Sequence, residues 1–210
     1  MKNKGKGGTI FIAGGMLLLA AALFLTGYNL YDEYRAGAAA DHVLETLQQQ
    51  IPEIPSDGTQ TPEQAELPDY IVNPDMEMPT EEIEGNDYIG VLEIPTLEIS
   101  LPVMSSWSYP KLKLAPCRYS GSTYTGNLVI AAHNYRTHFG PIKNLTVGAQ
   151  VTYTDVKGRC FSYEVAVVEV LESTAIQDMT SEKWDLTLFT CTYGGENRVA
   201  VRCVAADEGK

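Results

Sequence analysis

Residues 186–205 read LTLFTCTYGGENRVAVRCVA, in which two apolar and β-branched runs flank a pair of glycines. The pattern predicts two short strands, residues 186–191 and 198–205, joined by a glycine-bearing turn. Cys191 would end the first strand, and Arg198 would begin the second. Because facing residues of a hairpin lie close together, we expect the thiol and the guanidinium to be neighbours.

Further strand patterns lie ahead of this hairpin. They have the same β-branched and aromatic character, often alternate in polarity, and cover residues 88–94, 97–103, 127–133, 149–155 and 160–171. Helical patterns in this region are short and lie around residues 107–114 and 141–145. Seven or eight short strands with little helix predict an all-β domain, a closed or nearly closed β-barrel, over residues 87–210.

The N-terminus contains a long apolar segment. No charged residue occurs between Lys6 and Asp32, and this run is long enough to span a bilayer as a helix. Three lysines precede the segment and acidic residues follow it, which favours a cytoplasmic N-terminus. We therefore expect a cytoplasmic tail over residues 1–8, a transmembrane anchor over residues 9–31 and an extracellular remainder. A cleaved signal peptide is the alternative, which the small residues at 36–40 keep open.

Two segments of different composition join the anchor to the predicted barrel. Residues 32–50 are rich in Ala, Leu, Gln and Glu, which predicts a juxtamembrane helix. Residues 51–86 hold six of the chain's 11 prolines, ten acidic residues and no Lys or Arg, which predicts an extended acidic linker. Residues 70–78 could still lie along the barrel as a strap or a lid.

The negative charge is concentrated in that linker. The chain has 27 acidic and 15 basic side chains and a formal net charge of −12. Such a charge argues against a general nucleic-acid binder, because phosphate binding needs a basic surface. Residues 87–210 hold 13 acidic and 11 basic side chains, so the predicted barrel itself is nearly neutral.

Three side chains at strand ends could carry chemistry. His133 ends one predicted strand, and the predicted hairpin could bring Cys191 and Arg198 together. A basic neighbour makes a thiol a better nucleophile, an imidazole can protonate an amine leaving group, and a guanidinium can stabilise an oxyanion. The three together would suffice for acyl transfer through a thioester. The alternative is structural, since a strand-end cysteine is most often a small buried hydrophobe and a lone histidine usually packs.

The other cysteines outside the anchor are expected to be structural. These cysteines are Cys117, Cys160 and Cys203. Strand alternation turns Cys203 inward and Cys160 outward, which argues against a disulfide between these two. The sequence has no Cys-x-x-Cys pair that would suggest a zinc site. We expect no cofactor, and the residues do not indicate that calcium modulates the protein.

Several motifs, taken in order, resemble the sortases, the cysteine transpeptidases of Gram-positive cell surfaces. Residues 187–191, Thr-Leu-Phe-Thr-Cys, look like the family's TLxTC signature, and Arg198 falls where the family has its essential arginine. Residues 127–134 resemble the family's histidine-bearing strand, with Ala132 in place of a common glycine. The resemblance extends to the opening strand at residues 88–95, which looks like G-x-L-x-I-P, and so covers most of the predicted barrel.

The resemblance implies an eight-stranded sortase β-barrel and a two-step reaction. Cys191 would attack the Thr–Gly carbonyl of an LPxTG-like sorting signal and form a thioester, while Arg198 stabilises the oxyanion. His133 would protonate the departing amine and later accept a proton from the incoming one. Thr190 is a candidate for an oxyanion or substrate contact, and Asn134 is a candidate for orienting His133 or the substrate.

The resemblance also implies the partners and leaves the subtype open. The partners would be the membrane, surface proteins or pilins with C-terminal sorting signals, and an amine acceptor. Transfer of a surface protein to a peptidoglycan precursor is the first expectation, and polymerisation of pilins through a lysine amine is the alternative. Pilin-polymerising sortases often carry a lid with an aspartate and an aromatic residue, whereas residues 73–76, Asn-Pro-Asp-Met, supply Pro-Asp without the aromatic.

Two other functional classes remain. One is a cysteine hydrolase of a different fold, which the order of the strands argues against. The other is a non-catalytic surface binding module, which the presence of Cys191, His133 and Arg198 together argues against.

Overall fold

A computed structural model describes residues 6–52 and 67–206. Residues 1–5 of the expected cytoplasmic tail and residues 53–66 of the expected linker lie outside the described residues. The helices are α1 (Lys6–Gln50), α2 (Asp69–Val72), η1 (Pro95–Leu97), α3 (Tyr109–Leu112), η2 (Gly140–Asn144) and α4 (Ile176–Met179). The strands are β1 (Glu81–Ile83), β2 (Asn86–Ile94), β3 (Ile99–Met104), β4 (Cys117–Ser120), β5 (Leu128–Ala131), β6 (Gln150–Asp155), β7 (Cys160–Glu172), β8 (Leu186–Cys191) and β9 (Asn197–Ala205).

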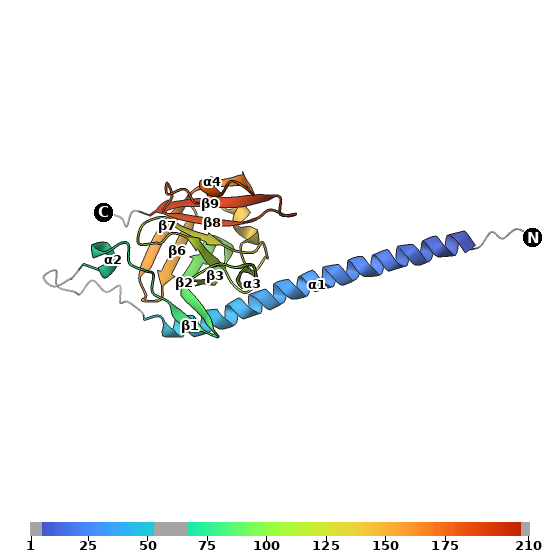
Figure 1. Cartoon of the computed structure of the whole chain (residues 1–210), viewed down its shortest axis with the longest axis horizontal. Coiled ribbons are helices and arrows are strands. Elements are labelled where there is room, and N and C mark those ends of the chain that lie inside the picture. The colour runs from blue at the N-terminus through green and yellow to red at the C-terminus, as the bar shows by residue number, and fades with distance from the viewer. Residues whose placement is uncertain (1–5, 53–66, 207–210) are drawn as a thin grey trace, which may run out of the picture. The chain divides into compact units, whose positions relative to one another are not determined.

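Eight of these strands close into a barrel (Figure 1). The sheet order is β1-β2-β3-β4-β5-β8-β9-β7-β6, and an antiparallel pairing between β2 and β6 closes the ring. β1 lies outside the ring as the hairpin partner of β2. A Cβ on Gly90 would lie 2.1 Å from the main-chain oxygen of Thr154, so only glycine fits where β2 meets β6. The predicted all-β class with a closed eight-stranded barrel is confirmed.

The two strands that lead to the candidate site run through the apolar core. All four residues of β5 are buried, and so are the first three of β8. Their side chains pack with those of the other strands in one cluster, which includes Leu92, Leu101, Ile130, Leu188 and Val201. Tight packing on both strands gives the residues at their ends a rigid support.

The N-terminal part of α1 forms a unit of its own, Met1–Arg35. Its large apolar side chains between Ile10 and Leu30 are exposed. Within the residues that the structure describes, α1 is the one helix that is long and apolar enough to cross a membrane, with a mean hydropathy of 2.3 in its most apolar stretch. These features are consistent with the expected single-pass anchor.

The C-terminal part of α1 belongs to the barrel unit, Ala36–Lys210. Its buried side chains are Ala36, Ala40, Val43 and Leu47, which recur every three or four residues and so share one helix face. Val43 and Leu47 pack in a second apolar cluster with Tyr88 and other residues of the barrel. We expected the folded domain to begin at residue 87, whereas the compact unit begins at Ala36 because this apolar face needs a partner.

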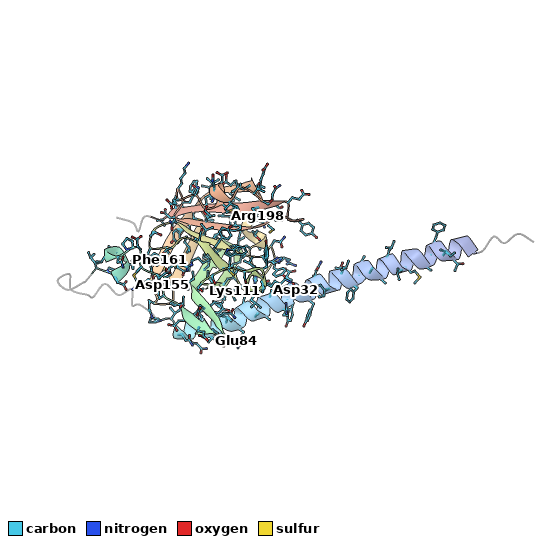
Figure 2. The ribbon with its side chains drawn as sticks, viewed as in Figure 1. Asp32, Glu84, Lys111, Asp155, Phe161 and Arg198 are labelled. Carbon is cyan, nitrogen blue, oxygen red and sulfur yellow. The ribbon has the colours of Figure 1, made fainter. Side chains whose placement is uncertain are left out.

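Residues 67–80 run along the barrel as a strap. The ring of Tyr70 in α2 stacks on Tyr124 with the centroids 5.1 Å apart and meets Phe161 edge-on at 5.5 Å. Phe161 lies near the start of β7 and Arg198 near the start of the antiparallel strand β9, so they are at opposite ends of the barrel (Figure 2). Of the two possibilities left open by the sequence, α2 therefore forms a strap at the end away from Arg198.

Candidate active site

Cys191 and Arg198 face each other across the β8–β9 hairpin. Their Cα atoms are directly paired in the antiparallel register. The N–H of Thr192 closes the turn by donating to the Asn197 carbonyl at 2.9 Å. Gly195 in this turn has a φ of +80°, a conformation that favours glycine. The two residues that the sequence predicts as neighbours are thus brought together, and Cys191 is a half-buried free thiol.

The guanidinium of Arg198 is fixed by the same turn. Its Nη1 donates to the carbonyl oxygens of Gly195 and Asn197, each at 3.0 Å. Both bonds use one nitrogen, so among the contacts of the described residues the donors on Nε and Nη2 are left for a ligand. Arg198 also lines the groove described below. Its position suits it to stabilise negative charge that develops next to Cys191.

His133 follows β5, the parallel neighbour of β8. The last pair of this register is Ala131 with Phe189, so His133 lies two residues past the end of β5, and Cys191 lies two residues past Phe189 in β8. Cys191 and Arg198 line the groove described below, and His133 is not among its lining residues. The Nδ1 atom of His133 lies 3.1 Å from Oδ1 of Asn134. The imidazole stacks on the ring of Tyr135 with the centroids 4.0 Å apart and the planes 6° from parallel. The structure therefore gives the ring two neighbours that fix its orientation.

The hydroxyl of Thr190 holds these two strands together at the site. It is buried and donates to the carbonyl of Ala132 at 2.8 Å. The N–H of Ala132 in turn donates to the carbonyl of Phe189 at 3.1 Å. Because a hydroxyl has a single proton to donate, the Thr190 side chain is already engaged, and its contribution is to align β5 with β8.

A groove of about 210 Å³ leads to Cys191. One wall is a series of aromatic rings: Trp107 meets Tyr109 edge-on at 5.7 Å and stacks on Tyr119 at 5.4 Å, and Tyr119 meets Phe189 edge-on at 5.2 Å. The remaining lining comes from α3, from β5 and the residue after it, from the end of β7, from the segment around α4, and from β8 and β9: Leu112, Ala131, Ala132, Glu172, Ser173, Ala175, Ile176, Met179, Thr190, Cys191 and Arg198. A largely apolar groove whose lining includes a thiol and a guanidinium suits an extended peptide with apolar side chains.

A buried arginine, which the sequence pattern did not single out, holds the α4 wall of this groove. Arg202 is fully buried, and its guanidinium donates to the carbonyls of Asp178 at 2.7 Å and Met179 at 3.1 Å. It also donates to Oγ1 of Thr187 at 3.1 Å and pairs with Glu169 at 2.8 Å. Strand alternation puts residues 198 and 202 on one face of β9, and that spacing is the sequence signal that could have pointed to Arg202.

The remaining cysteines are structural or remote from the groove. Cys203 and Cys117 are buried, and burial raises the pKa of each thiol to about 12. Cys160 is exposed, and all four cysteines of the chain are free. The predicted inward orientation of Cys203 and outward orientation of Cys160 are confirmed. Within residues 6–52 and 67–206, no three His, Cys, Asp or Glu side chains are grouped so that they could hold a metal ion.

Comparisons with known proteins agree with this arrangement. A family model described as the Sortase domain matches residues 92–206, which is more than half of the chain. Sortase C1 from Streptococcus suis is 24% identical, with a TM-score of 0.51 over 58% of this chain and 74% of that chain. A Clostridium perfringens sortase D5 transpeptidase is 22% identical, with a TM-score of 0.51 over 60% of this chain and 82% of that one.

A third similar structure is sortase C1 from Streptococcus agalactiae, 20% identical with a TM-score of 0.52 over 61% of this chain and 72% of that chain. At these identities the three likenesses concern the fold alone. The search of curated proteins found no match.

Proposed function

The chain belongs to the sortase family, and from that premise we propose that it is a membrane-anchored transpeptidase that acts through a thioester on Cys191. One observation carries the proposal: Cys191 and Arg198 are directly paired across the β8–β9 hairpin and both line the apolar groove, while His133 follows β5, the parallel neighbour of β8. The three groups are those that acyl transfer from an amide to an amine requires.

The first step is acylation. The sulfur of Cys191, as thiolate, attacks the carbonyl carbon between Thr and Gly of an LPxTG-like sorting signal, and the carbonyl oxygen becomes an oxyanion. The free donors of Arg198, together with main-chain N–H groups near Cys191, stabilise that charge. When the C–N bond breaks, protonated His133 gives its proton to the departing glycine nitrogen. The products are an acyl thioester on Cys191 and a free amine.

The second step returns the enzyme to its starting state. An incoming amine attacks the thioester carbonyl, and neutral His133 accepts the proton that this nitrogen loses. The C–S bond breaks, a new amide forms, and Cys191 leaves as thiolate. His133 thus acts as an acid in one step and as a base in the next, so its ring orientation affects both.

Asn134 and Thr190 have supporting roles in this proposal. When Nδ1 of His133 carries a proton, it can donate to Oδ1 of Asn134, which leaves Nε2 to exchange protons with the substrate. The Thr190 hydroxyl is bonded to the Ala132 carbonyl, so it aligns the strands and does not donate to the oxyanion.

The first candidate for the overall reaction is transfer of a surface protein to an amine of a peptidoglycan precursor. In pilin-polymerising sortases a lid often precedes the barrel, whereas here residues 67–80 carry no side chain that lines the groove, within the part of the chain that the structure describes. We propose that α1 crosses the membrane with the lysine-bearing N-terminus in the cytoplasm and the barrel outside.

The test uses the full chain in detergent micelles with an LPxTG peptide, in the presence and absence of triglycine. We expect a peptide–triglycine amide from the unaltered chain and no product from Cys191→Ala. Cleavage at one rate whatever the amine would favour a hydrolase, and a folded chain that neither cleaves nor transfers would favour a binding module. Replacing triglycine by a peptide with a single lysine amine tests the pilin-polymerising alternative.

A further inference from the structure

α1 approaches the loop that carries His133 closely at Gly37. A Cβ on Gly37 would lie 2.9 Å from Cγ2 of Thr137 and 3.2 Å from its Cβ, and real Cβ atoms essentially never come within 3.0 Å of a neighbour. Ala36 and Ala40 on the same helix face are 2% and 1% exposed. The helix therefore fits against this loop because position 37 has no side chain.

The loop between β5 and η2 is tied together by its own main chain. The N–H groups of His138 and Gly140 donate to the carbonyl of Tyr135 at 3.1 and 2.8 Å, and the N–H of Phe139 donates to the carbonyl of His133 at 3.2 Å. The side chain of Phe139 is fully buried. Because these bonds link residues 133–140, a displacement at Thr137 moves the main chain of His133 with it.

A series of rings connects the same contact to the candidate catalytic imidazole. The ring of His138 is fully buried beside the main chain of Ala36, but not in hydrogen-bonding geometry with it: neither ring nitrogen has a hydrogen-bond partner among the described residues. The Tyr135 ring lies 5.5 Å from that of His138 and stacks on that of His133 at 4.0 Å. The His133 ring is thus at one end of a row of three neighbouring rings, and His138 at the other end lies beside Ala36 of α1.

We propose that Gly37 is a positioning residue for transpeptidation: its close contact with Thr137 fixes the loop and thereby the position of the His133 ring. This inference rests on the proposed function and assigns a part in it to the segment between the anchor and the barrel. A side chain at position 37 would displace the loop by a few tenths of an ångström and lengthen the path of the proton to the leaving amine. None of residues 133–140 lines the groove, so we expect this contact to affect kcat more than KM.

The test compares two glycine-to-alanine substitutions in the same helix, in the full chain in detergent micelles. Gly37→Ala places a methyl group against Thr137, whereas Gly27→Ala places the same group where no atom lies within 4 Å. An LPxTG peptide and triglycine give kcat, KM and the pH profile. We expect Gly37→Ala to lower kcat by about tenfold with KM within about twofold, because misplacing a proton donor loses part of its catalytic effect. Gly27→Ala should match the unaltered chain.

Two further measurements separate positioning from loss of the fold. Thr137→Ala removes Cγ2 and Oγ1, so the double variant Gly37→Ala/Thr137→Ala should recover most of the lost kcat. A peptide thioester releases a thiolate, which leaves without a proton, so its single-turnover acylation of Cys191 should be unaffected by Gly37→Ala. Should Gly37→Ala not fold, Thr137→Ile crowds the same contact from the loop and carries the same expectations.

Failure of this inference and failure of the proposed function give different results. If the unaltered chain forms no amide product, the transpeptidase proposal is wrong and the inference goes with it. If the unaltered chain is active and the folded Gly37→Ala variant keeps its kcat, Gly37 does not position His133. An equal loss of rate on the amide and thioester donors would overturn the inference as well.

Discussion

Arg198 combines two tasks that depend on the guanidinium group. Nη1 is held by two carbonyls of the turn while the other nitrogens remain for the substrate, and a lysine has one nitrogen for both tasks. We predict that Arg198→Lys lowers kcat by about 10²–10³-fold, the cost of removing one oxyanion donor, and changes KM by less than about threefold. Steady-state kinetics on the LPxTG peptide measure both constants. An unchanged kcat would refute the oxyanion role.

His138 makes the stability of the fold depend on pH. Burial, and then the neighbouring His133, lowers its pKa from 6.5 to about 4. Between about pH 4 and pH 6.5 the unfolded chain binds a proton at His138 that the folded chain does not bind. The free energy of unfolding therefore falls as the pH drops below 6.5, and above pH 6.5 His138 does not change it. The full effect is on the order of 3 kcal/mol.

The prediction for His138 is a drop in Tm between about pH 7.5 and 5.5, a window in which ordinary carboxylates stay ionised. Thermal unfolding of the full chain at several pH values measures it, and His138→Phe should flatten the dependence. An equally steep dependence in His138→Phe would assign the effect to other groups.

The candidate active-site residues could be located from the sequence because each stands at the end of a strong strand pattern. Cys191 and Arg198 come together through the pairing of β8 with β9, which a strand pattern already implies, and His133 lies two residues past the end of β5, the neighbour of β8. The contact of Gly37 with Thr137 and the burial of His138 could not be predicted, because they depend on how a helix packs on a loop some 100 residues away in the sequence. A small residue in a helix looks the same in sequence whether or not a neighbour lies against it.

At the scale of elements, the short helices α3 and η2 were predicted near their observed positions, whereas β1, β4 and α4 were not predicted. The bounds of β8 agree with the predicted residues 186–191, whereas β1 and β4, with three and four residues, alternate too briefly to be recognised. The short helix α4 has four residues and depends on contacts from β9 for its place. Such elements are specified by their tertiary partners rather than by their own periodicity.

The α4 wall of the groove depends on Arg202. Its guanidinium bonds to the carbonyls of Asp178 and Met179, and the main-chain segment around them lines the groove (Figure 1 places α4 beside β8 and β9). We predict that Arg202→Met loosens this wall and raises KM for the peptide by about tenfold, because a displaced wall forfeits apolar contacts, while kcat changes less. Hydrogen exchange of residues 173–180 should speed up in parallel. A variant with faster exchange but an unchanged KM would contradict the role of α4 in binding.

At the scale of the whole molecule, the folded unit is larger than the motif-bearing barrel. Val43 and Leu47 of α1 and Ile83 of β1 are buried in one cluster with the barrel, and Met78 is buried in the main core. Burial of each such side chain stabilises the fold by about 1.5–3 kcal/mol. The sequence predicted the acidic composition of residues 51–86 but not that their C-terminal part would supply core residues, because a few apolar positions in a charged segment show no periodicity.

Residues 87–210 produced alone should therefore be markedly less stable than the full chain. We predict a lower Tm and faster proteolysis for this fragment, since it lacks the apolar partners from α1 and from residues 76–83. Thermal unfolding and limited proteolysis of both proteins in the same detergent measure the difference. Equal Tm values would mean that these segments pack against the barrel without contributing to its stability.

The measurement that bears most directly on the thioester mechanism is the mass of the protein after reaction with an LPxTG peptide in the absence of an amine. The account predicts an added mass equal to the peptide up to its threonine less one water, attached to Cys191 as an acyl group and released by hydroxylamine. Cys191→Ala should gain no mass. Cleavage of the peptide between threonine and glycine by Cys191→Ala, or an acyl group mapped to Cys160 or to a serine or threonine, would contradict it.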